Sequence, residues 1–336
     1  AIFEHRGDIF TVPKENGTWR NITNSSNAAD RSPIWSPKGD QIAWFSDQSG
    51  EYQLMIADQN GDNVKSIKLP NPTFYFRPDW SPDGKYIAFT DTNFTIWILN
   101  LETEKLTEVD SDKYAHPNRS MNPQWSPDSD WIAYAKQNNS SFKSIYAYQL
   151  STGKIIQITD PIADAITPVW DASGKYIYTL ASTNYGLQTG WLDMSSYDPS
   201  VTRSLYAVVL NKEDKAPNLP KTDEEDASTG LRQAQSDSSA KDKKDSKKKD
   251  GKSKDSKKKD DASTGSATKV TITEEGLFDR AVVLKLPARN YVALMKGPKN
   301  KVFIAEAIPN TPGLTVHTYD VSKEKATDYA KGVSSM

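Results

Sequence analysis

The chain has 336 residues and a formal net charge of −2, so no excess of positive charge indicates a nucleic-acid partner. It contains no cysteine, which excludes disulfides, thiolate catalysis and sulfur-based zinc sites. No run approaches the roughly 18 apolar residues that a membrane span needs. We therefore expect neither a nucleic-acid nor a membrane partner.

The chain begins with short runs of β-branched and aromatic residues separated by turn residues, a profile typical of all-β proteins. Residues 2–3, 8–12 and 18–23 are the first such runs, and Arg6-Gly7-Asp8 is predicted to be a hairpin turn. We interpret them as the outer strands of a sheet whose first strand precedes residue 1. The chain is therefore expected to be a fragment.

A repeat follows in the segments SPIWSPKGDQIAW, RPDWSPDGKYIAF, NPQWSPDSDWIAY and TPVWDASGKYIYT. Their tryptophans, Trp35, Trp80, Trp125 and Trp170, lie 45 residues apart. A fixed period in the forties, with several strands in each unit, indicates the blades of a β-propeller.

One unit shows how the repeat works. Trp80 ends a short strand, and residues 81–84 form a turn in which Pro presets φ and Gly tolerates positive φ. Residues 86–89 are predicted to be a buried strand, followed by strands at 94–99 and 106–109. Each Trp is expected to fill the wedge between neighbouring blades, where it hides roughly 200 Å² of apolar area.

The end of the chain repeats the pattern less clearly. Residues 290–294, 302–305 and 315–321 are predicted strands with a degenerate turn at 296–299, and the final GVSSM is interpreted as the start of another blade. The predicted fold is therefore an all-β propeller of four-stranded blades. The chain supplies about six blades of an expected seven-bladed ring and is truncated at both ends.

A charged insertion interrupts the fourth Trp-bearing blade. We divide the chain into propeller residues 1–211, a disordered Lys/Asp-rich insertion at 212–268 and continuing propeller at 269–336. Residues 203–210 and 269–273 are predicted strands that enter and leave the insertion. An electrostatic tether is one interpretation of the insertion, but the interleaved Asp residues favour a tolerated surface loop.

Candidate chemistry is scarce. The three histidines, His5, His116 and His317, have no metal-ligand spacing, and no nucleophile motif occurs. We therefore predict no catalytic, cofactor-binding or metal-binding residue, and no cofactor. A propeller enzyme with its active site in the ring is the weakest hypothesis.

Arg31, Arg77 and Arg119 precede the repeated tryptophans by four, three and six residues. The first strand of a blade borders the central channel, so these guanidinium groups are candidates for binding a carboxylate or a peptide there. Structural pairing between blades is the alternative, and it is favoured for each of them.

These residues carry a family resemblance. The W-S-P-D-G units are similar to those of TolB-like proteins, prolyl oligopeptidase relatives and tricorn proteases. FEHRGDIFTVP at 3–13, the segment from Ser32 to Leu54, and LFDRAVVLKLPARNYVAL at 277–294 resemble the second propeller of tricorn-type proteases. The likeness covers nearly the whole chain except the insertion.

The resemblance implies the non-catalytic propeller of an S41-type serine peptidase, acting as a scaffold and as a channel or filter for peptides. Its implied partners are oligopeptides and the PDZ-like and catalytic domains of its own parent chain, and a homo-oligomer stays open. The alternative is a TolB-like scaffold that binds other proteins. A cytoplasmic location is favoured, and an exported one stays open because the start of the gene is missing.

Overall fold

A computed structural model describes residues 1–113, 121–185, 201–217, 219, 269–298 and 300–334. The chain divides into two units, residues 1–218 with 267–336 and residues 219–266, and all described strands belong to the first unit. Residues 212–217, which open the predicted insertion, are described, and Lys175 Nζ lies 2.6 Å from Asp214 Oδ1 there. No helix among the described residues is long and apolar enough to cross a bilayer.

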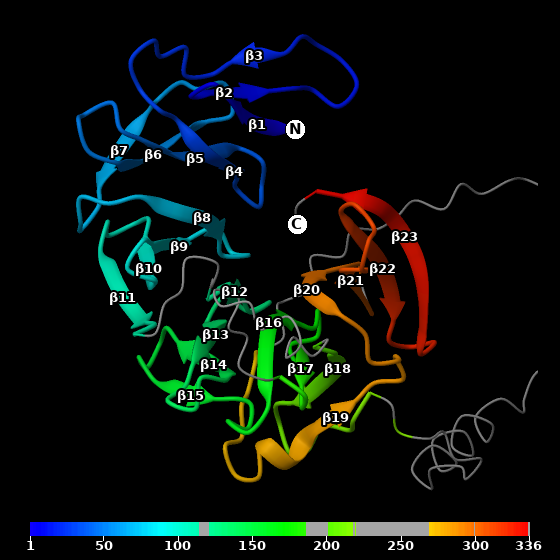
Figure 1. The fold of residues 1–336 in the computed structure, drawn as a ribbon. Coiled ribbons are helices and arrows are strands. Elements are labelled where there is room, and N and C mark those ends of the chain that lie inside the picture. Colours follow the sequence, from blue (N-terminus) through cyan, green and yellow to red (C-terminus); the bar gives the residue numbers. More distant parts are fainter. Residues whose placement is uncertain (114–120, 186–200, 218, 220–268, 299, 335–336) are drawn as a thin grey trace, which may run out of the picture. The chain divides into compact units, whose positions relative to one another are not determined.

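The described strands form one three-stranded and five four-stranded antiparallel sheets, in chain order (Figure 1). The first sheet contains β1 (Ile2–His5), β2 (Asp8–Thr11) and β3 (Arg20–Asn21). The second contains β4 (Arg31–Trp35), β5 (Gln41–Ser46), β6 (Gln53–Asp58) and β7 (Lys65–Lys68). The third contains β8 (Tyr75–Trp80), β9 (Tyr86–Asp91), β10 (Thr95–Asn100) and β11 (Leu106–Ser111).

Each of the remaining three sheets has four strands. The fourth contains β12 (Gln124–Trp125), β13 (Trp131–Gln137), β14 (Lys143–Gln149) and β15 (Ile155–Gln157). The fifth contains β16 (Asp164–Trp170), β17 (Tyr176–Ser182), β18 (Ser204–Val209) and β19 (Ala281–Val283), with the 3-10 helix η2 (Phe278–Arg280) before β19. The sixth contains β20 (Tyr291–Lys296), β21 (Lys301–Glu306), β22 (Leu314–Asp320) and β23 (Lys325–Val333).

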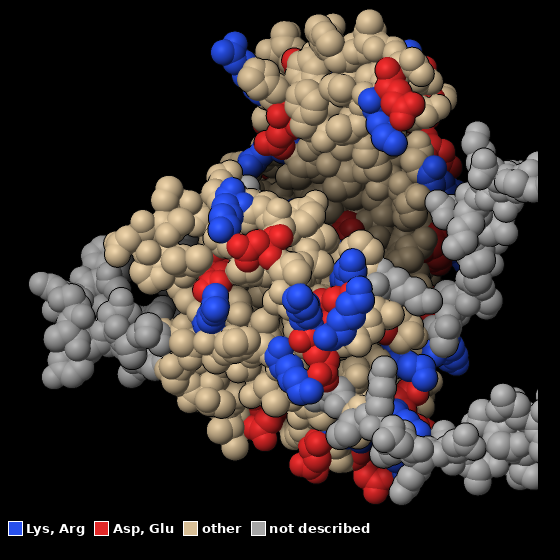
Figure 2. Space-filling view, turned by 90° about the vertical axis from the view of Figure 1, so that its right-hand side faces the viewer, with Lys and Arg blue, Asp and Glu red and all other residues tan. Residues whose placement is uncertain are grey.

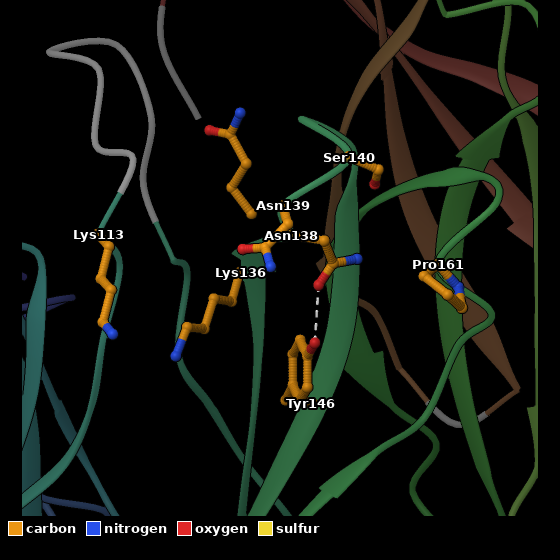
Figure 3. A pocket seen from close by; sticks show the side chains of 8 residues that line it. Lys113, Lys136, Asn138, Asn139, Ser140, Tyr146 and Pro161 are labelled. Atoms are coloured by element: carbon orange, nitrogen blue, oxygen red, sulfur yellow. Dashed lines mark hydrogen bonds between the residues drawn. The ribbon is translucent and has the colours of Figure 1, made fainter.

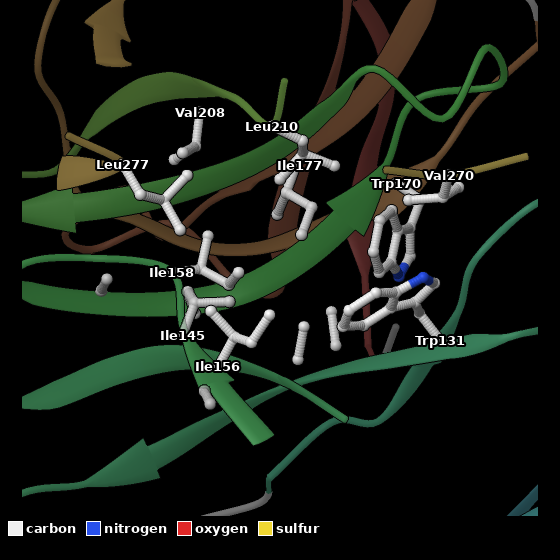
Figure 4. Packing of buried hydrophobic residues seen from close by; sticks show 14 residues of the cluster. Trp131, Ile145, Ile156, Ile158, Trp170, Ile177, Val208, Leu210, Val270 and Leu277 are labelled. Carbon is white, nitrogen blue, oxygen red and sulfur yellow. The ribbon is translucent and has the colours of Figure 1, made fainter. Parts of the chain in front are cut away.

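Neighbouring sheets pack face to face, and the first strands β4 and β8, β12 and β16, and β16 and β20 lie side by side on the inner side of this unit (Figure 1). Each repeated Trp belongs to a hydrophobic cluster that its own sheet shares with the preceding one. Trp170, for example, lies beside Trp131 of the preceding sheet (Figure 4). This arrangement confirms the predicted all-β propeller architecture, and the four Trp side chains pack between neighbouring sheets.

Hydrogen bonds reinforce two of the wedges. The indole N–H of Trp125 donates to the carbonyl oxygen of Asp79 at 3.1 Å, and that of Trp170 donates to the carbonyl oxygen of Gln124 at 2.9 Å. In each case the acceptor immediately precedes the Trp position of the previous sheet. The same indole nitrogen of Trp80 is buried and has no partner among the described residues, so this wedge depends on packing alone.

The W-S-P-D-G segment forms the predicted turn between the first two strands of a sheet. The Ser81 hydroxyl oxygen accepts the backbone N–H groups of Lys85 and Tyr86 at 3.2 and 3.0 Å. The N–H of Gly84, whose φ is +75°, donates to the Ser81 carbonyl oxygen at 2.9 Å. Positive φ favours Gly, so the backbone conformation of this turn explains why Gly occupies position 84.

The ends of the unit differ partly from expectation. Arg6 and Gly7 form the predicted hairpin turn, with φ of 52° and 85°. The strand predicted at 269–273 is absent, because Val270 is buried in a core cluster and the sheet is completed by β19 instead. Gly332 and Val333 end β23 rather than beginning another blade.

Candidate functional site

A residue with positive φ recurs three residues before each repeated Trp. Ser32, Arg77, Asn122 and Thr167 have φ of 54°, 52°, 48° and 49° and lie 45 residues apart. The ladders of β4, β8 and β16 shift register at these positions, and a Pro follows each of them. A bulge redirects the side chain of the extra residue, so this position can present a different group in every sheet.

The bulge brings two polar side chains of neighbouring sheets together. The Arg77 guanidinium donates to the side-chain oxygen of Asn122. Arg31 lies one residue before its bulge, half-buried, with its guanidinium carbon 5.6 Å from the Phe74 ring centre, which is a cation–π contact. Arg119 lies outside the described residues. The structure therefore places Arg31 and Arg77 in different environments rather than in one shared site.

Asp79, which follows the bulge of β8, is exposed to water, but protein atoms surround much of its carboxyl group. This partial desolvation raises the pKa of its carboxyl to about 6, and the positive charge of Lys296 opposes the rise. Lys296 is exposed at the end of β20, three sheets further along the chain. The first strands β8 and β20 thus carry side chains of opposite charge.

The last two sheets contain a buried ion pair and a separate network around His317. Asp164 Oδ2 lies 3.2 Å from Arg203 Nη2, and Arg203 Nη1 donates to the Tyr291 carbonyl oxygen at 3.3 Å. His317 lies between two carboxylates, with Nε2 2.8 Å from Glu306 Oε2 and Nδ1 3.0 Å from Asp328 Oδ1. An imidazolium can donate to both carboxylates at once, whereas neutral imidazole can donate to one.

Within the part of the chain that the structure describes, neither this network nor His5 forms a metal site. Among the described residues, no group of three or more His, Asp or Glu side chains could hold a metal ion. His5 contacts the Phe10 ring edge-on at a centroid distance of 6.4 Å, and His116 lies outside the described residues.

A polar pocket opens beside the hairpin that joins β13 and β14 (Figure 3). Its volume is about 480 Å³, and its lining is formed by Lys113, Lys136, Gln137, Asn138, Asn139, Ser140, Tyr146 and Pro161. No carboxylate of the described residues lines it. A pocket of this volume accommodates a small ligand or a few residues of a peptide.

Hydrogen bonds hold much of this lining in place. Lys136 Nζ lies 2.6 Å from Asp110 Oδ1. The Tyr146 hydroxyl donates to Asn138 Oδ1 at 2.7 Å, and Asn138 Nδ2 donates to Ser144 Oγ at 2.7 Å. Burial, and secondarily the charge of Asp110, raises the pKa of Tyr146, so its hydroxyl stays protonated near neutral pH.

The charge pattern of the outer surface gives less support for a binding site than the inner strands and the pocket do. On the face shown in Figure 2, Lys and Arg side chains are interspersed with Asp and Glu side chains. Exposed pairs such as Lys285 and Glu324, 2.6 Å apart, contribute little to stability.

The sequence alone did not single out Asp79, Lys296 or the pocket. Asp79 could have been found, because it occupies the position before the repeated Trp, where Ile34 and Val169 are apolar. Lys296 stands at the end of the first strand, where the second to fifth sheets have Trp. The pocket combines residues from one hairpin and two loops, and no local pattern marks it.

Comparison with known proteins gives a family-level match. The family model described as "Tricorn protease second beta propeller domain" matches residues 1–336. No curated protein matches the chain.

One solved structure supports the fold. The crystal structure of the tricorn protease is similar with a TM-score of 0.67 at 16% identity, over 97% of this chain and 29% of that one. TolB from Acinetobacter baumannii is similar with a TM-score of 0.48 at 13% identity, over 97% of this chain and 60% of that one. The chain thus spans less than a third of the length of the tricorn protease that it matches.

Proposed function

Because the chain belongs to the family of the second β-propeller domain of tricorn proteases, we propose that it is the non-catalytic propeller of a larger serine-type peptidase of the S41 class. In this proposal the propeller is a scaffold that admits and orients oligopeptides, and hydrolysis takes place elsewhere in the parent protein. The observation that carries the proposal is the family match over all 336 residues.

Polar inner strands support a role in admitting peptides. Arg77, Asp79 and Lys296 place both signs of charge on β8 and β20. A peptide at neutral pH has a cationic amino end and an anionic carboxyl end, so charges of both signs can favour its entry and bias its orientation. We propose peptides and the catalytic part of the same parent protein as the partners of this chain.

The test uses the full-length parent protein and two substrates. Arg77→Met and Lys296→Met are expected to lower kcat/KM for an oligopeptide with free ends. Hydrolysis of a small neutral reporter is expected to stay unchanged, because such a molecule needs no electrostatic guidance. Equal effects on both substrates, or no effect on either, would contradict the filter role.

Lys68→Met is a matched control, because it removes an equally exposed positive charge from the edge strand β7. Since β7 is the fourth strand of its sheet, the change should leave both substrates unaffected. If Lys68→Met lowered kcat/KM as much as Lys296→Met did, overall charge would explain the effect.

A further inference from the structure

The chain contains two Asn-Gly sequences, and the fold places them in different surroundings. Asn16-Gly17 lies in the loop between β2 and β3, and Asn60-Gly61 lies in the turn between β6 and β7. An Asn-Gly sequence is chemically reactive, because Gly has no side chain to shield its backbone nitrogen, which can attack the side-chain carbonyl carbon of the Asn. In a folded protein this attack requires that both residues move freely.

The first of these sequences is free to move. Asn16 and Gly17 are both exposed. Within the described part of the chain, no hydrogen bond holds the Asn16 side chain or the Gly17 backbone N–H. The loop forms bends without a regular turn, and Gly17 has a φ of 113°, which residues with a side chain rarely adopt. The reacting nitrogen and the reacting carbonyl group are therefore both available.

The second sequence is held by hydrogen bonds at both reacting groups. Asn60 Oδ1 accepts a hydrogen bond from Arg20 Nη1 at 2.9 Å. The backbone N–H of Gly61 donates to the Asp58 carbonyl oxygen at 3.0 Å. The backbone is also closely packed, since a Cβ on Gly61 would lie 2.6 Å from Ile22 Cγ2. Attack at Asn60 therefore requires local opening of this turn.

We propose that Asn16 is a site of spontaneous covalent modification, at which the Asn side chain is converted to aspartate and isoaspartate. The backbone nitrogen of Gly17 bonds to the side-chain carbonyl carbon of Asn16, and the side-chain nitrogen leaves as ammonia together with the displaced proton. Water then hydrolyses the cyclic imide. Cleavage of the bond from nitrogen to the side-chain carbon gives aspartate, and cleavage of the bond to the backbone carbonyl carbon gives isoaspartate. Water is the sole co-reactant, and no atom is oxidised or reduced.

The surroundings of Asn16 allow the product to accumulate. Either product adds a negative charge to an exposed loop, beside Glu15. Isoaspartate also lengthens the backbone between β2 and β3, because the chain then runs through the former side chain. Surface loops tolerate added length at little cost in free energy. The modified chain is therefore expected to stay folded.

Peptide mapping by mass spectrometry tests the proposal on the full 336-residue chain, incubated at mildly alkaline pH. Asn16 is expected to lose its amide at least about tenfold faster than Asn60, in line with the hydrogen bonds that must break at Asn60. In concentrated urea the two sites should react at similar rates, because both are followed by Gly. The comparison separates the effect of the fold from that of the local sequence.

Two variants locate the reaction. Arg20→Met removes the hydrogen bond to Asn60 Oδ1, so it should raise the rate at Asn60 several-fold and leave the rate at Asn16 unchanged. Asn16→Gln should remove the acidic species that ion-exchange chromatography detects in the incubated parent, because the longer side chain closes a larger ring slowly. Both side chains are exposed, so melting temperatures should stay close to that of the parent.

Three results would overturn the proposal. If Asn60 reacted as fast as Asn16 in the folded chain, the hydrogen bonds of the β6–β7 turn would not protect it. If Asn16 stayed intact in the folded chain over a period in which it reacts in urea, the loop would hold it. If the acidic species persisted in Asn16→Gln, the modification would occur at another residue.

Discussion

Truncation of one inter-sheet Trp is the sharpest test of the architecture. Trp170 is 2% exposed and packs in the cluster shared by the fourth and fifth sheets. Burying roughly 200 Å² at about 25 cal/mol per Å² corresponds to about 5 kcal/mol, and its hydrogen bond to Gln124 adds about 1 kcal/mol. Partial relaxation around the cavity reduces the expected cost of Trp170→Ala to about 3–5 kcal/mol.

Differential scanning calorimetry measures this cost as a shift in melting temperature. At about 2 °C per kcal/mol for a large domain, Trp170→Ala should melt roughly 6–10 °C lower. Trp19, which is 64% exposed, is the matched control, and Trp19→Ala should change the unfolding free energy by no more than about 0.5 kcal/mol. If the two variants melted alike, Trp170 would not be the wedge that joins the sheets.

Three further predictions concern charge, the buried network and the backbone. The native pKa of Asp79, raised to about 6 from 3.8, means that stability falls as pH rises between these values. Asp79→Asn should therefore raise the free energy of unfolding, and with it the melting temperature, at pH 7 but not at pH 3.5. The gain should be about 1 kcal/mol at most, because the group is partly exposed. An equal gain at both pH values would refute this. His317→Ala should cost about 1–3 kcal/mol by removing a partner of buried Glu306. A double-mutant cycle with Glu306→Gln should show coupling, and additive effects would contradict it. Gly297→Ala places a Cβ 2.6 Å from the Lys301 carbonyl oxygen and should cost about 1–3 kcal/mol in calorimetry, so an unchanged melt would exclude the close approach.

The fold was predictable from the sequence because the repeated residues pack each sheet against the next one. The spacing of Trp35, Trp80, Trp125 and Trp170 fixed the length of a blade, and the alternation around Trp80 located its strands. The segment at 269–273 was wrongly predicted to be a strand. In the sequence, an apolar residue such as Val270 looks the same whether it is buried in a strand or in a loop that packs against the core. Which β-rich segment completes a sheet depends on backbone pairing, and after an insertion the sequence does not specify it.

The candidate sites were less predictable, because they combine positions far apart in the chain. Arg77 was noticed from its distance to Trp80, but its contact with Asn122 depends on the bulge of β8 and on the positive φ of Asn122. The charge of Lys296, on the sixth sheet, lowers the pKa of Asp79, on the third. No sequence period encodes such a pairing, since each residue departs from its own repeat independently.

The most direct test of the proposed function compares the isolated chain with the full-length protein on one panel of fluorogenic oligopeptides. We predict that the full-length protein hydrolyses the peptides, and that the 336-residue chain binds them without hydrolysis. Hydrolysis by the isolated chain, or a full-length protein with no peptidase activity, would contradict the assignment of a non-catalytic propeller in a larger peptidase.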